Sequence, residues 1–161
     1  MNHAIRFFVG LDVHKESIAI GVAGAGREEP RFLGTVGPDP AQLRKALRRI
    51  GPPAALHIVY EAGPSGYGLV RELGARGYRC EVIAPSKLAC RPGDRIKTDR
   101  RDALLLARLA RSGELVPITV PDARDEALRD LSRARSDAVR ARLKARQQLK
   151  ALLLRNRAGR S

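Results

Sequence analysis

The sequence lacks the long apolar runs and the cysteine patterns that would place the chain in a membrane or in an oxidising compartment. Its unbroken apolar stretches stay far below the ~20 residues that a membrane-spanning helix needs, and no signal peptide is predicted before Phe7. Cys80 and Cys90 stand ten residues apart, which predicts neither a disulfide framework nor a zinc site. These absences predict a cytoplasmic protein with reduced thiols and no membrane partner.

Acidic and aromatic residues are also scarce. The chain has 31 Lys and Arg residues against 17 Asp and Glu, a net charge of +14. Such an excess favours a polyanionic partner, nucleic acid above all. The use of 25 Arg against 6 Lys could reflect genomic base composition, but that bias does not explain the excess over acids. With three Phe, three Tyr and no Trp, base stacking is a poor prospect, and we expect phosphate contacts and shape reading.

The apolar pattern of these 161 residues predicts one domain of the α/β class with an appendage. The predicted elements are strands at 7–13, 17–23 and 31–36, a helix after Pro40, a strand at 56–61, a helix at 65–76, a strand at 80–85 and a helix at 98–111. This order predicts a mixed five-stranded sheet with helices on its faces, in a first domain at 1–113.

The C-terminal part is predicted to be one long basic helix at 122–158, after a linker at 114–121 and before a tail at 159–161. Its small apolar residues follow a heptad seam, which predicts a coiled coil or helical hairpin that dimerises the chain. From Arg124 onward, 12 basic against 4 acidic residues leave a charge of +8. A solvated face and a nucleic-acid surface are equally good explanations of that charge. The candidate contacts on this helix are Arg135, Arg142 and Arg146.

Four carboxylates occupy informative positions: Asp12 near the end of the first strand, Glu61 at the end of the fourth, and Asp99 and Asp102 in the first turn of a helix. Strand ends and helix starts border one crevice in an open α/β sheet. Four acids together would repel unless cations bound them. The set therefore predicts a site for Mg²⁺ or Mn²⁺, with two ions suited to phosphodiester chemistry.

Each acid also has a structural explanation. Asp99 and Asp102 suit a helix N-terminus, with Thr98 as the N-cap. Glu61 could simply begin a turn, whereas an acid inside an apolar strand, as at Asp12, needs a partner or a metal. Ser65 suits an N-cap better than a catalytic nucleophile. His14 could touch phosphate, but an exposed loop histidine is the better interpretation.

The stretches GLDVHKESIAIGVAG, YEAGPSGYGLVRELGARGYRCEVIAPSK and KTDRRDALLLARLA together resemble the N-terminal domain of DEDD transposases of bacterial insertion sequences. That domain is similar to the Holliday-junction resolvase RuvC. The resemblance runs from about Phe7 into the long helix. It implies an RNase H-like fold and a metal-binding, catalytic role for Asp12, Glu61, Asp99 and Asp102. DNA and a structured guide RNA are the implied partners.

Members of that family carry a second, C-terminal domain with a serine that attacks DNA. Ser161 is no candidate for that serine, so we expect this chain to keep the metal and nucleic-acid parts without completing transposition alone. The basic residues beside the acids, Lys15, Lys97, Arg100 and Arg101, are predicted phosphate contacts in a nucleoid-associated protein.

Two other classes compete with this interpretation. A sugar-kinase or actin-like ATPase shares the strand-hairpin start, but it needs a second domain and a second phosphate loop, and a charge of +14 fits it poorly. A non-catalytic nucleic-acid-binding and dimerisation protein, acting as a regulator or an inert remnant, would use the basic helix and let the acids serve structure.

Overall fold

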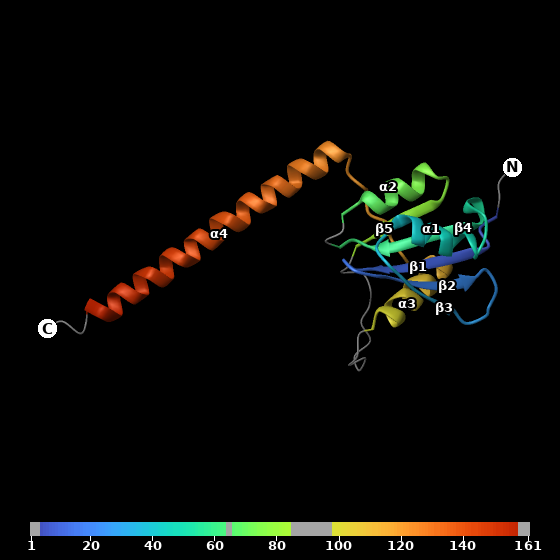
Figure 1. Ribbon diagram of the computed structural model, residues 1–161, viewed down its shortest axis with the longest axis horizontal. Coiled ribbons are helices and arrows are strands. Elements are labelled where there is room, and N and C mark those ends of the chain that lie inside the picture. Colours follow the sequence, from blue (N-terminus) through green and yellow to red (C-terminus); the bar gives the residue numbers. More distant parts are fainter. Residues whose placement is uncertain (1–3, 64–65, 85–97, 158–161) are drawn as a thin grey trace. The chain divides into compact units, whose positions relative to one another are not determined.

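The computed structural model describes residues 4–63, 66–84 and 98–157, which divide into two compact units between Val120 and Pro121 (Figure 1). The elements of the first unit are β1 (Phe7–Val13), β2 (Ile18–Gly24), β3 (Arg31–Val36), α1 (Pro40–Arg48), the short 3-10 helix η1 (Pro53–Ala55), β4 (Leu56–Glu61), α2 (Gly68–Ala75), β5 (Arg79–Ile83) and α3 (Asp99–Ser112). The second unit contains α4 (Ala123–Arg157).

Within the described residues, five strands form one sheet in the order β3-β2-β1-β4-β5. Strands β1, β2 and β3 form an antiparallel meander, and β4 and β5 run parallel to β1. The carboxyl ends of β1, β4 and β5 therefore meet at one edge of the sheet. This arrangement confirms the predicted mixed five-stranded sheet with flanking helices, followed by a long helix.

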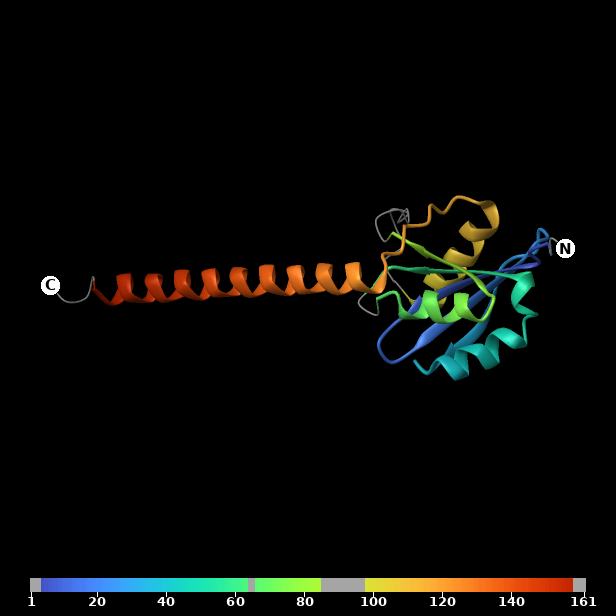
Figure 2. The same cartoon turned by 90° about the horizontal axis from the view of Figure 1, so that it is seen from above.

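Helices cover both faces of the sheet, and alternate residues of each strand face different helices. Val9 and Leu11 of β1 pack in one cluster with Leu43 and Leu47 of α1. Helix α3 packs on the other face (Figure 2). There Leu106 packs in a second buried cluster. We call this second side the α3 face.

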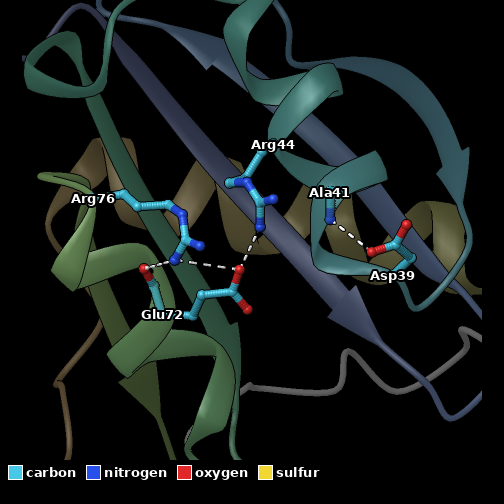
Figure 3. Close-up of polar contacts among 5 residues, drawn as sticks. All are labelled: Asp39, Ala41, Arg44, Glu72 and Arg76. Atoms are coloured by element: carbon cyan, nitrogen blue, oxygen red, sulfur yellow. Dashed lines mark hydrogen bonds and ion pairs between the residues drawn. The ribbon is translucent and has the colours of Figure 1, made fainter.

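On the face of the sheet opposite α3, a polar contact joins helix α1 to helix α2 (Figure 3). Glu72 of α2 accepts from the Arg44 guanidinium of α1, and Arg76 lies 3.4 Å from the same carboxylate oxygen. Only about a quarter of the Arg44 and Glu72 side chains is exposed, at 22% and 24%. Helix α1 begins at the predicted Pro40, where the Asp39 carboxylate accepts the Ala41 N–H at 2.8 Å. These contacts hold α1 and α2 together over the sheet.

Helix α2 begins three residues later than the pattern predicts. Gly66 has a φ of +66°, in the left-handed region, so the chain is still turning there. A residue of the sheet accepts a hydrogen bond from the first turn of this helix: the Val70 N–H donates to the Tyr60 hydroxyl at 3.3 Å. Burial of Tyr60 raises the pKa of its phenol, which keeps it protonated. The predicted N-cap, Ser65, lies outside the described residues.

The segment predicted as a linker packs along β5. Ile118 donates its N–H to the Val82 carbonyl at 2.8 Å, and Pro117 forms an antiparallel bridge with Ile83. Leu115 contacts the buried cluster on the α3 face, and Ile118 contacts the cluster under α1. These contacts make residues 114–120 part of the first compact unit.

Helix α4 exposes almost its whole surface. Its exposed large apolar side chains are Leu128, Leu131, Val139, Leu143, Leu149, Leu152, Leu153 and Leu154. Ion pairs within the helix join Arg133 to Asp130 and Arg140 to Asp137, and such exposed pairs contribute little stability. Among the described helices, none is both long and apolar enough to cross a membrane.

Candidate metal centre

Two neighbouring glycines bring α3 unusually close to the sheet. Gly10 of β1 and Gly21 of β2 pair in register and both face α3. A Cβ atom at Gly10 would lie 2.3 Å from the Ala103 carbonyl oxygen, and one at Gly21 would lie 2.4 Å from the same atom. No side chain fits into that space. The helix therefore rests on backbone, and its first turn is held near the end of β1 and the start of β2.

Asp12 and Glu61 lie side by side at the carboxyl ends of the neighbouring strands β1 and β4. Leu11 pairs with Tyr60 across the parallel strands β1 and β4, so the next residue of each strand is an acid. Neighbouring strands lie about 4.7–4.9 Å apart. Because side chains alternate, Asp12 lies on the same face as Gly10. Glu61 lies on the same face as Val59, which packs on α3. Both acids thus belong to the α3 face, as the interpretation of a shared crevice requires.

The first turn of α3 supplies the other two acids. Thr98 caps the helix as predicted: its hydroxyl accepts the Arg101 N–H at 3.4 Å. Asp99 and Asp102 both lie in this turn, and Ala103, which follows them directly, is the residue that contacts both glycines. The glycine contact therefore determines how near these two acids lie to the strand ends.

A histidine joins the acids at this edge. The His14 Nε2 atom lies 3.1 Å from the Asp12 carboxylate and 3.5 Å from that of Asp99. Among the described residues, the group whose ligand atoms all lie within 4.8 Å of one another consists of Asp12, His14 and Asp99. Glu61 and Asp102 lie outside this tight group. The sequence interpretation treated His14 as an exposed loop residue; its position two residues after Asp12 was the available signal.

Asp12 is under electrostatic strain in the ion-free protein. Burial raises the pKa of its carboxyl above the ordinary value, and the charges of Asp102 and Asp99 raise it further. The hydrogen bond with His14 and the charge of that ring lower the pKa, but less than burial raises it. Its side chain is 14% exposed, against 56% for Asp99. A partly buried carboxylate facing two others is a good environment for a cation.

The donor set at this edge fits a divalent metal ion. Asp12 and Asp99 offer carboxylate oxygens and His14 a ring nitrogen within one group. Asp102 is close enough to raise the pKa of Asp12, and Glu61 ends the adjacent strand. Hard oxygen ligands suit Mg²⁺ and Mn²⁺, and imidazole suits the transition metals. The residues that could hold an ion are thus the four predicted acids and His14.

The structure gives mixed support for the predicted phosphate contacts. Arg100 extends over the Phe32 ring of β3, with its guanidinium carbon 5.5 Å from the ring centre. Arg101 is exposed in the same helical turn. Lys15 is 93% exposed and lies 3.5 Å from the Glu16 carboxylate. Lys97 lies outside the described residues. The remaining three, Arg135, Arg142 and Arg146, are exposed on α4.

A comparison with family models identifies the kind of protein. The model for DEDD transposases of the IS110 type, described as Transposase, matches residues 9–156. The chain belongs to this family. The resemblance noted in the sequence is confirmed, and the DEDD transposase assignment covers both compact units.

Two curated relatives agree with the family assignment. The chain is 48% identical over 151 residues to the putative transposase y4qE of Sinorhizobium fredii. It is 38% identical over 153 residues to the transposase for insertion sequence element IS1533 of Leptospira borgpetersenii. These alignments cover 92% and 93% of this DEDD transposase chain, but 39% and 44% of the relatives. The chain thus spans less than half the length of either relative.

Solved structures of RuvC from Thermus thermophilus, alone and in complex with a Holliday junction substrate, are also similar to this transposase chain. Each has a TM-score of 0.46 and 16% sequence identity, and covers 70% of this chain and 99% of the RuvC chain.

Proposed function

We propose that this chain is the metal-dependent DNA-cleaving part of an IS110-type transposase. One observation carries the proposal: the parallel strands β1 and β4 end in Asp12 and Glu61 side by side, on the face where α3 begins with Asp99 and Asp102. Neither strand pairing nor helix capping requires acids at both strand ends. Their convergence near Asp12, a partly buried carboxylate whose pKa is raised, favours a cation site over a structural role.

In this proposal the four acids hold two Mg²⁺ or Mn²⁺ ions. Bound ions of this kind activate an attacking oxygen and stabilise the leaving oxygen at a phosphodiester. The protein residues position the ions and the DNA. Asp12, as the most buried of the described ligands in the tight group, anchors the site. Lys15, Lys97, Arg100 and Arg101 contact the phosphates on either side of the bond that is cut.

The long helix has a separate proposed role. We assign dimerisation or higher assembly to residues 122–158, because large apolar side chains along α4 are exposed in the single chain. Arg135, Arg142 and Arg146 of the same helix contact nucleic acid. Replacing Leu131 and Leu152 by Asn tests the assembly role. Analytical ultracentrifugation is expected to show the wild type as a dimer or larger and the variant as a monomer; identical oligomers would contradict it.

The proposed domain roles are metal-dependent catalysis for residues 1–113 and assembly for 122–158, in a cytoplasmic, nucleoid-associated protein. We further propose a structured guide RNA as a second partner, supported by the family resemblance and the charge of +14.

Isothermal titration calorimetry tests the metal site. Mg²⁺ and Mn²⁺ are titrated into the wild type, Asp12→Ala and Asp102→Ala. Binding by the wild type that both variants lose supports the proposal. Weak binding that is the same in all three proteins overturns it. That result leaves the second candidate, a non-catalytic nucleic-acid-binding and dimerisation protein, for which the exposed basic helix is the favouring observation.

A further inference from the structure

His14 lies inside the carboxylate group rather than beside it. It follows β1 and opens the turn to β2, where its N–H donates to the Ser17 carbonyl at 2.9 Å. That backbone bond fixes the start of the side chain. From there the ring reaches back, so that Nε2 lies 3.1 Å from Asp12 and 3.5 Å from Asp99. A single nitrogen atom thus lies between two carboxylates that come from different elements.

Stability alone gives a weak reason for this placement. About half of the His14 ring and of the Asp99 side chain is exposed, at 53% and 56%. An ion pair between two groups as exposed as His14 and Asp99 contributes little stability. The adjacent Lys15 carries a permanent positive charge, but it lies 3.5 Å from the Glu16 carboxylate instead. The group that faces the acids is the one whose neutral form is a metal ligand.

We propose that His14 is a nitrogen ligand of the ion held by Asp12 and Asp99, and that it makes the site prefer Mn²⁺ over Mg²⁺. The inference rests on the proposed metal site and adds to it a residue and an ion preference. Mg²⁺ takes oxygen ligands and keeps several waters, whereas imidazole binds Mn²⁺ and later transition metals more readily. A site with one ring nitrogen among carboxylates therefore discriminates between the two ions.

The experiment compares both ions in the full chain. Calorimetric titrations with MnCl₂ and with MgCl₂ are made on the wild type, His14→Ala and His14→Gln. The expected wild-type affinity is higher for Mn²⁺. Removal of the ring should lower Mn²⁺ affinity about tenfold or more, the usual range for a residue that supports a metal site, and change Mg²⁺ affinity much less. A ratio of the two affinities that both variants leave unchanged overturns the proposal.

A matched control removes charge from the same turn without removing a ligand. Glu16 is 80% exposed and pairs with Lys15, so Glu16→Gln should leave the ratio of Mn²⁺ to Mg²⁺ affinity unchanged. Pulsed electron paramagnetic resonance of the Mn²⁺ complex gives a direct readout. We expect a ¹⁴N coupling in the wild type and its loss in His14→Ala. No nitrogen coupling in the wild type contradicts the assignment.

The outcomes separate this inference from the proposed function. In one outcome the wild type binds both ions, Asp12→Asn abolishes that binding, and His14→Ala changes neither affinity. The metal site is then supported and the proposed role of His14 is overturned. If the wild type binds neither ion, both fall. Circular dichroism spectra and Tm values without metal confirm that each variant is folded, and His14→Gln keeps a polar side chain of similar reach for that purpose.

Discussion

At Asp12, stability and ion binding oppose each other. Burial raises the pKa of its carboxyl, and so do the charges of Asp102 and Asp99. A group whose pKa is higher in the folded than in the unfolded state stabilises the fold when protonated. That stabilisation is lost as the pH rises through the folded pKa. Ionised Asp12 therefore destabilises the metal-free fold relative to the protonated form, and the proposed cation would offset this loss of stability.

Asp12→Asn should consequently raise the Tm of the metal-free protein while abolishing its response to metal. In the wild type, an ion at 100 times its Kd stabilises the fold by about 2.7 kcal/mol. The variant should show no such increase. Differential scanning calorimetry with and without MnCl₂ measures both effects. A variant that is less stable without metal, and that still gains stability with it, would contradict a cation site at Asp12.

His57 and Glu81 form a second charged contact, distant from the acids on the same face. The His57 Nε2 atom lies 2.9 Å from one Glu81 carboxylate oxygen, and Arg79 donates to the other at 3.0 and 3.1 Å. Partial burial raises the pKa of Glu81, but these hydrogen bonds and charges outweigh it and hold the pKa below its ordinary value. The contact stabilises the pairing of β4 with β5.

Stability should therefore depend on pH through Glu81. An ordinary glutamate titrates near 4.5, so the stabilisation is present above that pH and is lost as the pH falls through the lower, folded pKa. Glu81→Gln should cost about 1–3 kcal/mol at pH 7, since it weakens hydrogen bonds to a charged group. The difference in Tm from the wild type should shrink between pH 7 and pH 3. A constant difference across that range would argue against the contact.

At the scale of the elements, the position of α3 depends on two glycines of the sheet, which carry no side chain where the helix packs. Gly10 and Gly21 leave room for the helix backbone, and the helix presents Ala103 and Ala107 to them. Larger residues on either side would lift α3 away from the sheet. Because Asp99 and Asp102 lie in the helical turn before Ala103, such a shift would also move them away from Asp12 and Glu61.

Gly10→Ala tests this dependence. The added Cβ would lie 2.3 Å from a backbone oxygen and 2.5 Å from a backbone nitrogen of α3, so the helix has to move. We expect a loss of about 1–3 kcal/mol from overpacking, together with weaker Mn²⁺ binding. Gly74→Ala in α2 is the matched control: nothing lies within 4 Å of its Cβ position. It should stabilise the fold by about 0.4–1 kcal/mol and leave metal binding unchanged. Equal effects of the two substitutions would contradict the positioning role.

At the scale of the whole molecule, the apolar core lies in the first unit, and half of the net positive charge lies in the second. The buried apolar residues belong to the first unit, whose core continues through residues 114–120. The described part of the second unit, residues 121–157, is almost entirely exposed, and α4 is strongly basic. An exposed helix of 35 residues gains little stability from burial within its own chain.

Deletion of residues 122–161 should separate the two roles. The remaining chain should keep its metal response, because the acids and their supporting contacts lie in the first unit. Its affinity for duplex DNA should fall and lose most of its steep dependence on salt, since fewer phosphates are neutralised. Fluorescence anisotropy at about 50 to 200 mM NaCl measures the DNA affinity and its dependence on salt. Unchanged affinity and slope would assign DNA binding to the first unit.

The sequence by itself determined the order of the elements and the ends of most strands, and it singled out the four acids as a predicted metal site. Short apolar runs between polar breaks and turns identify the strands at 7–13 and 31–36, and Asp39 and Thr98 mark two helix starts, because these signals are local. The start of α2 was missed because its N-terminal acceptor is Tyr60, eight residues before the helix begins.

Only the tertiary structure decided which of these groups meet. Strand order placed Asp12 beside Glu61, the contact at Gly10 and Gly21 determined how closely α3 approaches, and the turn after β1 brought His14 between Asp12 and Asp99. It also packed residues 114–120 on β5. The physical reason is that each of these contacts joins atoms far apart in the chain, or depends on a side-chain direction that residue type does not specify.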